Sequence, residues 1–124
     1  MLLSSPEKEA EVQKRERDVE RKLADRTGEL GGIAYKFTSP GSDGVPDRLI
    51  LLPYGILYFV ELKTDIGQLS PIQKAQQDRI RNLGFRVETV YGETDVDRLV
   101  NEMSKRLDAA RAEIIDRSLK GRIR

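Results

Sequence analysis

The segment that decides the fold is residues 44–63, which read GVPDRLILLPYGILYFVELK. Two largely apolar runs, 47–52 and 56–63, flank the turn-forming residues 53–55, and this arrangement is typical of a β-hairpin. The apolar residues in both runs are continuous rather than alternating. We therefore expect a hairpin that is buried on both faces.

The turn length sets the register of this hairpin. A three-residue turn pairs Leu52 with Ile56 and places Asp47 opposite Glu61 at the other end of the two strands. Opposed side chains have Cβ atoms about 4.5–5.5 Å apart. Lys63 follows Glu61 by two positions, so it points to the same face. The sequence thus predicts that Asp47, Glu61 and Lys63 meet at the open end of the hairpin.

Helix caps, prolines at first helical positions and glycine stops predict the other elements. In chain order these are a helix from Ser5 to about Gly31, a strand over 33–37, the hairpin, a helix from Ser70 to Gly84, a strand over 85–91 and a helix over about 94–120, capped by Thr94 or Asp95. This pattern predicts an α/β fold with the order αβββαβ and an additional C-terminal helix. We expect one domain over residues 1–124, with its core at about 14–91.

Composition narrows the possible chemistry. The 124 residues include 22 Lys or Arg and 21 Asp or Glu, for a formal net charge of +1, and no Cys or His. These absences exclude thiol nucleophiles, catalytic triads with histidine and zinc fingers. No apolar run approaches the roughly 20 residues of a membrane span, and residues 1–3 are too short for a signal-peptide core. We expect a cytoplasmic protein with no membrane partner, in which any nucleic-acid contact uses local positive charge.

Two carboxylates at the predicted distance repel each other unless one is protonated or a cation lies between them. Mg²⁺ or Mn²⁺ would answer this, with oxygen ligands from Asp47, Glu61 and the backbone of Leu62. Such an ion supports phosphodiester hydrolysis without histidine. Lys63 would then orient the attacking water or neutralise the charge that develops on the phosphate. A plain cross-strand ion pair is the simpler interpretation of the same residues.

Three further features have both a structural and a functional interpretation. Glu16 lies on the apolar stripe of the first predicted helix and could complete the metal site, and Glu20, about 40° further round, is the alternative. Gln73 stands third after the cap residue Ser70, where it fits a capping box as well as an active site. The basic end of the chain, which comprises Arg117, Lys120, Arg122 and Arg124, is more typical of a helix terminus than of a DNA clamp.

Several of these residues carry a family resemblance. Asp47 after Pro46, followed by Glu61-Leu62-Lys63, resembles the signature of the PD-(D/E)XK nuclease superfamily. Gly31-Gly32, the 39–41 turn, the 44–49 segment and Ser70-Pro71-Ile72-Gln73 extend the resemblance to the VRR-NUC domain over residues 14–91.

The resemblance implies a restriction-endonuclease-like core and divalent-metal-dependent DNA cleavage. By analogy, Glu16, Asp47 and Glu61 would bind the metal, Lys63 would be the catalytic lysine, and Gln73 an accessory active-site residue. Short stand-alone members of the family, from phages and bacteria, resemble homodimeric resolvases of four-way (Holliday) junctions.

Two other functions remain open from the sequence. The chain could be a non-catalytic DNA-binding or assembly protein that keeps the nuclease fold. It could also be a nuclease subunit whose specificity comes from a partner. Metal binding that depends on Glu61 separates the first of these from an active enzyme.

Overall fold

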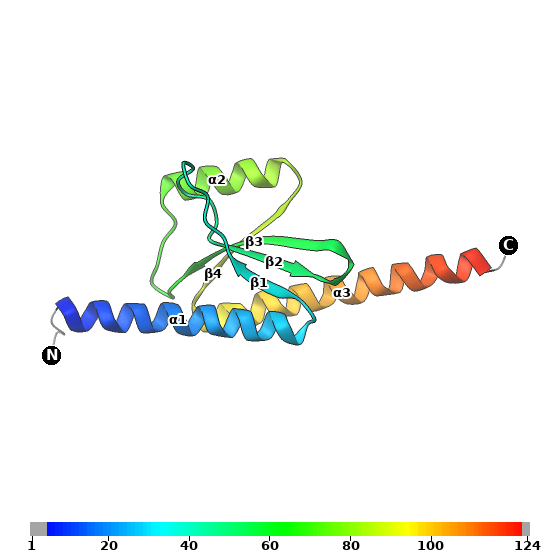
Figure 1. Cartoon of the computed structure of the whole chain (residues 1–124), viewed down its shortest axis with the longest axis horizontal. Helices are drawn as coiled ribbons and strands as arrows, with labels where there is room; N and C mark the ends of the chain where they lie inside the picture. Colours follow the sequence, from blue (N-terminus) through cyan, green and yellow to red (C-terminus); the bar gives the residue numbers. More distant parts are fainter. Residues whose placement is uncertain (1–4, 123–124) are drawn as a thin grey trace.

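The structure, a computed structural model, describes residues 5–122 and contains one four-stranded sheet between helices (Figure 1). Its elements in chain order are α1 (Ser5–Glu29), β1 (Ile33–Lys36), β2 (Arg48–Leu52), the 3₁₀ turn η1 (Pro53–Gly55), β3 (Ile56–Lys63), α2 (Pro71–Asn82), β4 (Arg86–Tyr91) and α3 (Gly92–Arg122). The predicted order αβββαβ with an additional C-terminal helix is confirmed. Residues 1–3 and Arg124, which entered the sequence analysis, lie outside the described residues.

The strands lie side by side in the order β1-β2-β3-β4. β1, β2 and β3 are antiparallel neighbours, whereas β3 and β4 are parallel and are connected through α2. In the hairpin, Leu52 pairs with Ile56 and Arg48 with Val60, which confirms the predicted register. Asp47 directly precedes β2 and therefore lies at the level of Glu61.

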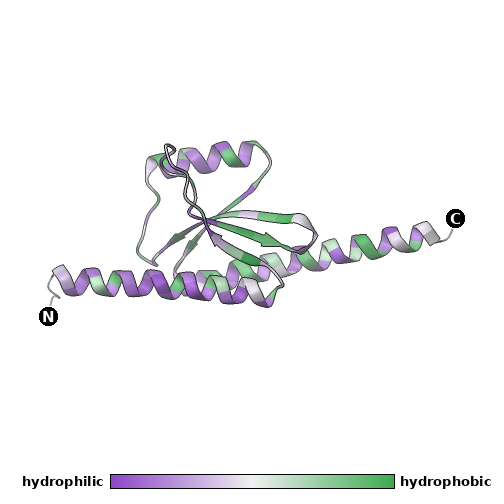
Figure 2. Ribbon diagram, in the orientation of Figure 1, coloured by the Kyte–Doolittle hydropathy of each residue, from purple (hydrophilic) through white to green (hydrophobic). Residues whose placement is uncertain are grey.

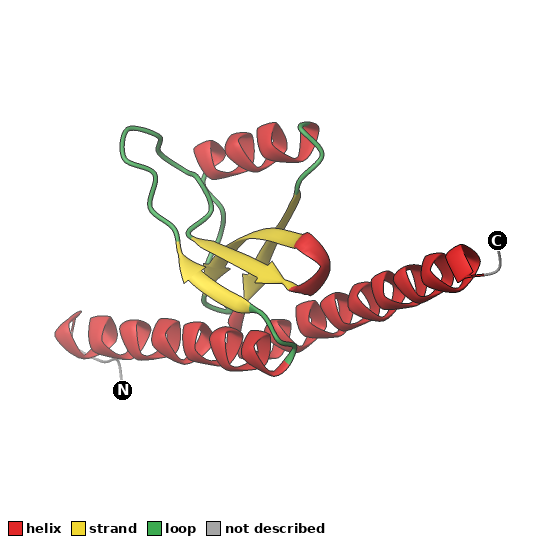
Figure 3. Cartoon of the chain, turned by 45° about the vertical axis from the view of Figure 1, so that its right-hand side comes forward, coloured by secondary structure: helices red, strands yellow, loops and turns green. Residues whose placement is uncertain are grey.

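The helices form layers on the two faces of the sheet. α1 and α3 pack together beneath one face, and α2 lies over the other (Figures 1 and 3). α1 is hydrophilic apart from a narrow stripe, whereas β2 and β3 carry the hydrophobic residues (Figure 2). Within residues 5–122, no helix combines the length and the apolar character that crossing a membrane requires. The core between the sheet, α1 and α3 includes Leu23, Ile50, Tyr58, Leu99 and Met103.

The expectation that the hairpin is buried on both faces is wrong for one face. Ile50, Leu52, Tyr58 and Val60 point toward α1 and α3 and are buried. On the α2 side, however, Leu51 of β2 is 41% exposed. The reason is that α2 packs mainly on β4 and reaches the hairpin only at its open end, so much of this face of β1 and β2 has no helix over it.

The last helix begins earlier than predicted. α3 starts at Gly92, so Thr94 and Asp95 lie inside its first turn instead of preceding it. Asp95 still serves this helix end, because its carboxylate accepts a hydrogen bond of 2.9 Å from the backbone N–H of Tyr91. A side chain that reaches back in this way satisfies an amide that the helix itself leaves without an acceptor.

Candidate active site

Asp47 and Glu61 are joined directly at the open end of the β2–β3 hairpin. The backbone N–H of Asp47 donates to Oε2 of Glu61 over 3.1 Å, and the backbone N–H of Leu62 donates to Oδ1 of Asp47 over 3.1 Å. Each acid is thus held by the backbone of the opposite strand. These paired hydrogen bonds extend the hairpin by one step beyond the ladder and fix both carboxylates on its end.

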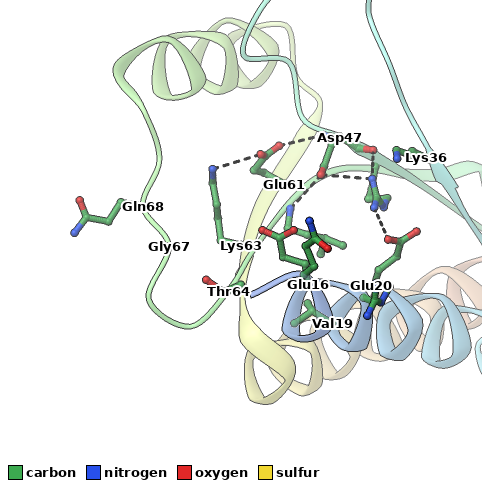
Figure 4. Close-up of a pocket in the computed structure, with 14 residues that line it drawn as sticks. Glu16, Val19, Glu20, Lys36, Asp47, Glu61, Lys63, Thr64, Gly67 and Gln68 are labelled. Atoms are coloured by element: carbon green, nitrogen blue, oxygen red, sulfur yellow. Dashed lines mark hydrogen bonds and ion pairs between the residues drawn. The ribbon is translucent and has the colours of Figure 1, made fainter. Parts of the chain in front are cut away.

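Lys63 completes the group predicted from the register. Its Nζ lies 3.7 Å from Oε1 of Glu61. Figure 4 shows Asp47, Glu61 and Lys63 around one cleft, which has a volume of about 630 Å³. The cleft lies between α1 and the ends of β2 and β3, and Leu62 is among the residues that line it. The structure therefore brings Asp47, Glu61, Leu62 and Lys63 together.

Gln73 forms the predicted capping box and also contacts Glu61. Ser70 and Gln73 form a complete capping box at the start of α2, in which Oε1 of Gln73 accepts from the Ser70 N–H over 2.9 Å. Its Nε2 donates to Oε1 of Glu61 over 2.9 Å. The cap fixes the side chain of Gln73 on α2, and the amide then holds the Glu61 carboxylate from the side opposite Asp47.

The approach of α2 to the hairpin depends on Gly44, which begins the 44–63 segment. Gly44 has φ +81°, and a Cβ atom placed there would lie 2.9 Å from the backbone carbonyl of Ile72. Only glycine can combine this backbone conformation with such close packing. The loop before Asp47 therefore rests directly on the first turn of α2, one residue from Gln73.

The environment of Glu61 disfavours its charge. Burial is the main cause, and the neighbouring charge of Asp47 adds to it, so the pKa of Glu61 rises from 4.5 to about 7. Lys63 and the hydrogen bond from the Asp47 N–H act in the opposite direction but do not balance these effects. At neutral pH the cleft thus contains a carboxyl group that a cation would readily convert to its charged form.

The two candidate acids of α1 occupy different places. Glu16 lines the cleft beside Lys63, on the side of α1 that faces the strand ends (Figure 4). Glu20 instead forms an ion pair of 3.0 Å with Nη2 of Arg48. Within residues 5–122, no three acidic side chains lie close enough to form a metal-ligand group, so Glu16 does not join Asp47 and Glu61 in one.

Sequence reasoning missed Arg48. It is only 7% exposed, lines the cleft and contacts both Asp47 and Glu20. The signal was present in the strand alternation, because Arg48, Ile50 and Leu52 share the face of β2 that points into the core. A cationic residue at an inward position of a strand requires a partner.

Comparisons with known proteins address the fold and the general activity. No family model matches the chain. Over 73 residues the chain is 45% identical to "Putative nuclease p44" of Acyrthosiphon pisum secondary endosymbiont phage 1, across 59% of this chain and 78% of that protein. A solved "VRR_NUC domain" structure shares 33% identity with a TM-score of 0.66, and the match covers 70% of this chain and 95% of that one.

The chain belongs to the VRR-NUC family. A second solved structure, named "VRR_NUC domain protein", has a TM-score of 0.56 at 15% identity over 71% of this chain and 86% of that one, and it supports the fold alone. The cleft with Asp47, Glu61 and Lys63 therefore lies in a nuclease fold.

Proposed function

We propose that this VRR-NUC protein is a divalent-metal-dependent DNA endonuclease that hydrolyses phosphodiester bonds at branched DNA, with four-way junctions as its preferred substrate. The observation that carries the proposal is the meeting of Asp47, Glu61 and Lys63 in one cleft. Family membership and the phage relative named as a nuclease support the general activity. The choice of branched DNA rests on the resemblance to stand-alone family members.

The residues present fit a hard divalent cation. Oxygen donors are the preferred ligands of Mg²⁺ and Mn²⁺, and Mg²⁺ commonly uses one or two carboxylates together with waters and substrate phosphate. Asp47 and Glu61 supply the carboxylates, Leu62 would supply a backbone oxygen, and Glu16 would approach from α1. The raised pKa of Glu61 favours this assignment, because a cation relieves the repulsion from Asp47 that contributes to the rise.

When bound, the ion would supply the Lewis-acid chemistry of phosphodiester hydrolysis. The side chains of the cleft have separate tasks. Lys63 is placed to hold the attacking water or to stabilise the negative charge that develops on the phosphate. Gln73 and the Asp47 N–H hold the two oxygens of Glu61 in a fixed orientation. Such prior orientation lowers the cost of reaching the reactive geometry.

The proposed partner is DNA, and the proposed assembly is a homodimer. Symmetric cleavage of two strands requires two active sites related by a two-fold axis. Lys36 and Arg17 line the cleft and provide local positive charge beside it. This arrangement suits a protein of formal net charge +1, because the cations need to gather only where the DNA backbone passes.

A cleavage assay tests the activity. Labelled four-way junctions, flaps and plain duplex are incubated with the protein in Mg²⁺, Mn²⁺ or EDTA. We expect cutting of junctions with either metal and none in EDTA. Asp47→Ala should reduce the cleavage rate at least about 100-fold. It removes a proposed metal ligand, and even residues that only contact such ligands commonly change metal affinity or activity by about 10–100-fold.

Asp43→Ala is the matched control, since Asp43 is an exposed acid of the same loop that does not line the cleft. It should cut like the wild type. The proposal is wrong if no substrate is cut in a metal-dependent way, or if Asp47→Ala cuts as well as wild type. Binding of junctions without cleavage would favour a non-catalytic DNA-binding protein.

A further inference from the structure

Arg48 is a deeply buried cation beside the cleft. Its side chain is 9% exposed, and within the described chain its Nε has no hydrogen-bond partner. Burying a guanidinium costs free energy unless its remaining N–H groups bind acceptors. The fold therefore buries this charge at a cost in free energy. The contacts of Nη1 and Nη2 show which groups Arg48 holds in place.

Nη1 of Arg48 is directed at Asp47. It donates to the backbone carbonyl of Asp47 over 2.8 Å and lies 3.4 Å from Oδ2 of the same residue. Oδ1 of Asp47 is held from the other side by the N–H of Leu62. The Asp47 carboxylate is therefore fixed at both oxygens, with one contact from β3 and the other from Arg48.

Nη2 of Arg48 is directed at α1, where it meets Oε2 of Glu20 at 3.0 Å (Figure 4). Glu20 is 48% exposed in its side chain, so it holds Arg48 from the solvent side. A planar guanidinium can bind two acceptors at fixed angles, which a lysine cannot do. Arg48 thus connects the first helix to the acid that begins the hairpin.

We propose that Arg48 is a positioning residue that sets the orientation of the Asp47 carboxylate. Glu20 holds the Arg48 guanidinium in place and does not itself bind the metal. The metal part of this inference rests on the function proposed above. Residues behind metal ligands commonly change metal affinity by about 10–100-fold. The division of roles also selects Glu16 as the α1 acid that is available to the cleft.

The test begins with the metal-free protein. The Leu62 N–H reports on Asp47, because Oδ1 of Asp47 is its acceptor. Hydrogen exchange and the amide resonance of Leu62 are measured by NMR in wild type, Glu20→Gln, Arg48→Lys and Arg48→Met. We expect faster exchange at Leu62 in Arg48→Met, an intermediate effect in Arg48→Lys and a smaller one in Glu20→Gln.

The same proteins are then titrated with Mn²⁺ in a calorimeter. Arg48→Met should weaken binding about 10–100-fold and Glu20→Gln less. Glu20→Gln should have no further effect when Arg48 is already Met, because it acts through Arg48. If Glu20 were a ligand, its loss would weaken binding equally in both backgrounds, and that result would overturn its assigned role.

Asp97→Asn is the matched control. Asp97 binds Arg26 of α1 at 2.8 Å and has the same side-chain exposure as Glu20, 48%, but it does not line the cleft. It should leave the Leu62 amide and Mn²⁺ binding unchanged. An unaltered Leu62 amide in both Glu20→Gln and Arg48→Met would overturn the inference. If the Leu62 amide changes as expected in the variants but the wild type binds no Mn²⁺, the result would instead count against the proposed function.

Discussion

Glu61 has a carboxyl group in a place that disfavours its charge. Burial and the nearby Asp47 raise its pKa from 4.5 to about 7. Between these two values the folded protein keeps a proton on Glu61 that the unfolded chain has lost. The free energy of unfolding therefore falls as the pH rises through this window, and the full cost of the charge is present above about pH 7.

Glu61→Gln removes this pH dependence. In EDTA, raising the pH from 4.5 to 8 should lower the unfolding free energy of the wild type by about 2–3 kcal/mol more than that of the variant, since the amide cannot take up the unfavourable charge. At pH 4.5 the variant should be the less stable protein, because its NH₂ group meets an N–H donor where the carboxyl group of Glu61 accepts from Asp47 and Gln73. With saturating Mn²⁺ at pH 8 the wild type should gain stability and the variant should gain less, because the amide is a poorer metal ligand. Urea unfolding at each pH measures these differences.

Glu9→Gln serves as the control for this experiment. Glu9 is an exposed acid in the first part of α1, away from the cleft. Its loss should leave the pH dependence of the unfolding free energy as in wild type. The account of Glu61 fails if Glu61→Gln follows the wild-type pH dependence in EDTA.

At the scale of elements, the contact between the 37–47 loop and α2 sets the geometry of the cleft. Gly44 lets the loop rest on the backbone of Ile72. Gln73, the residue after Ile72, holds the carboxylate of Glu61. A shift of α2 away from the loop would therefore move the Gln73 amide away from the carboxylate. Stability and activity should change together when this contact is disturbed.

Gly44→Ala tests this coupling. The new Cβ would meet the Ile72 carbonyl at 2.9 Å, in a backbone conformation with φ +81°. Gly41→Ala is a matched control in the same loop, with φ +79° but nothing within 4 Å of the new Cβ. Both variants carry backbone strain, so Gly44→Ala should lose about 1–3 kcal/mol more stability than Gly41→Ala.

Junction cleavage should also fall in Gly44→Ala and remain near wild type in Gly41→Ala. Thermal unfolding and the cleavage assay measure the two effects. Equal losses of stability in the two variants would show that the close approach of α2 contributes nothing beyond the strained backbone.

The elements also show what the sequence could and could not predict. The turn at 53–55 defined the register, so the meeting of Asp47, Glu61 and Lys63 followed from counting residues. The burial of individual side chains could not be predicted by counting residues. Leu51 lies within a continuous apolar run and yet is 41% exposed, because the position of α2 over β4 depends on tertiary packing. The ion pair of Glu20 with Arg48 likewise could not be predicted by counting, because it joins distant parts of the chain.

At the scale of the whole molecule, the end of α3 has an exposed apolar side. Ile114, Ile115 and Leu119 are 47%, 52% and 53% exposed on a helix that extends beyond the sheet (Figures 1 and 2). The other side carries the ion pairs Arg117–Glu113 and Lys120–Asp116. An isolated helix end gains little stability without tertiary packing, so this apolar side suits the interface of the proposed homodimer.

The charges at the two ends of the molecule favour a specific arrangement. The start of α1 extends beyond the sheet at the end opposite the α3 terminus (Figure 1). Residues 5–12 include three Glu and one Lys, whereas residues 111–122 include four basic and two acidic residues. In the proposed homodimer, a two-fold axis perpendicular to the long axis would bring each α3 end onto the start of the other copy's α1. This contact would occur twice and close the assembly.

Ile115→Glu tests this interface. The substitution places a charge in the apolar side of the α3 end, so we expect dimerisation to weaken at least about 10-fold. Because Ile115 is half exposed in the chain itself, the melting temperature of the monomer should change little.

Ala109→Glu is the control, since Ala109 is exposed and lies about 120° round the helix from Ile115. Sedimentation equilibrium over a range of concentrations, with and without junction DNA, measures the assembly. A wild-type protein that stays monomeric in both conditions contradicts the homodimer, whereas an Ile115→Glu protein that dimerises like wild type contradicts only this interface.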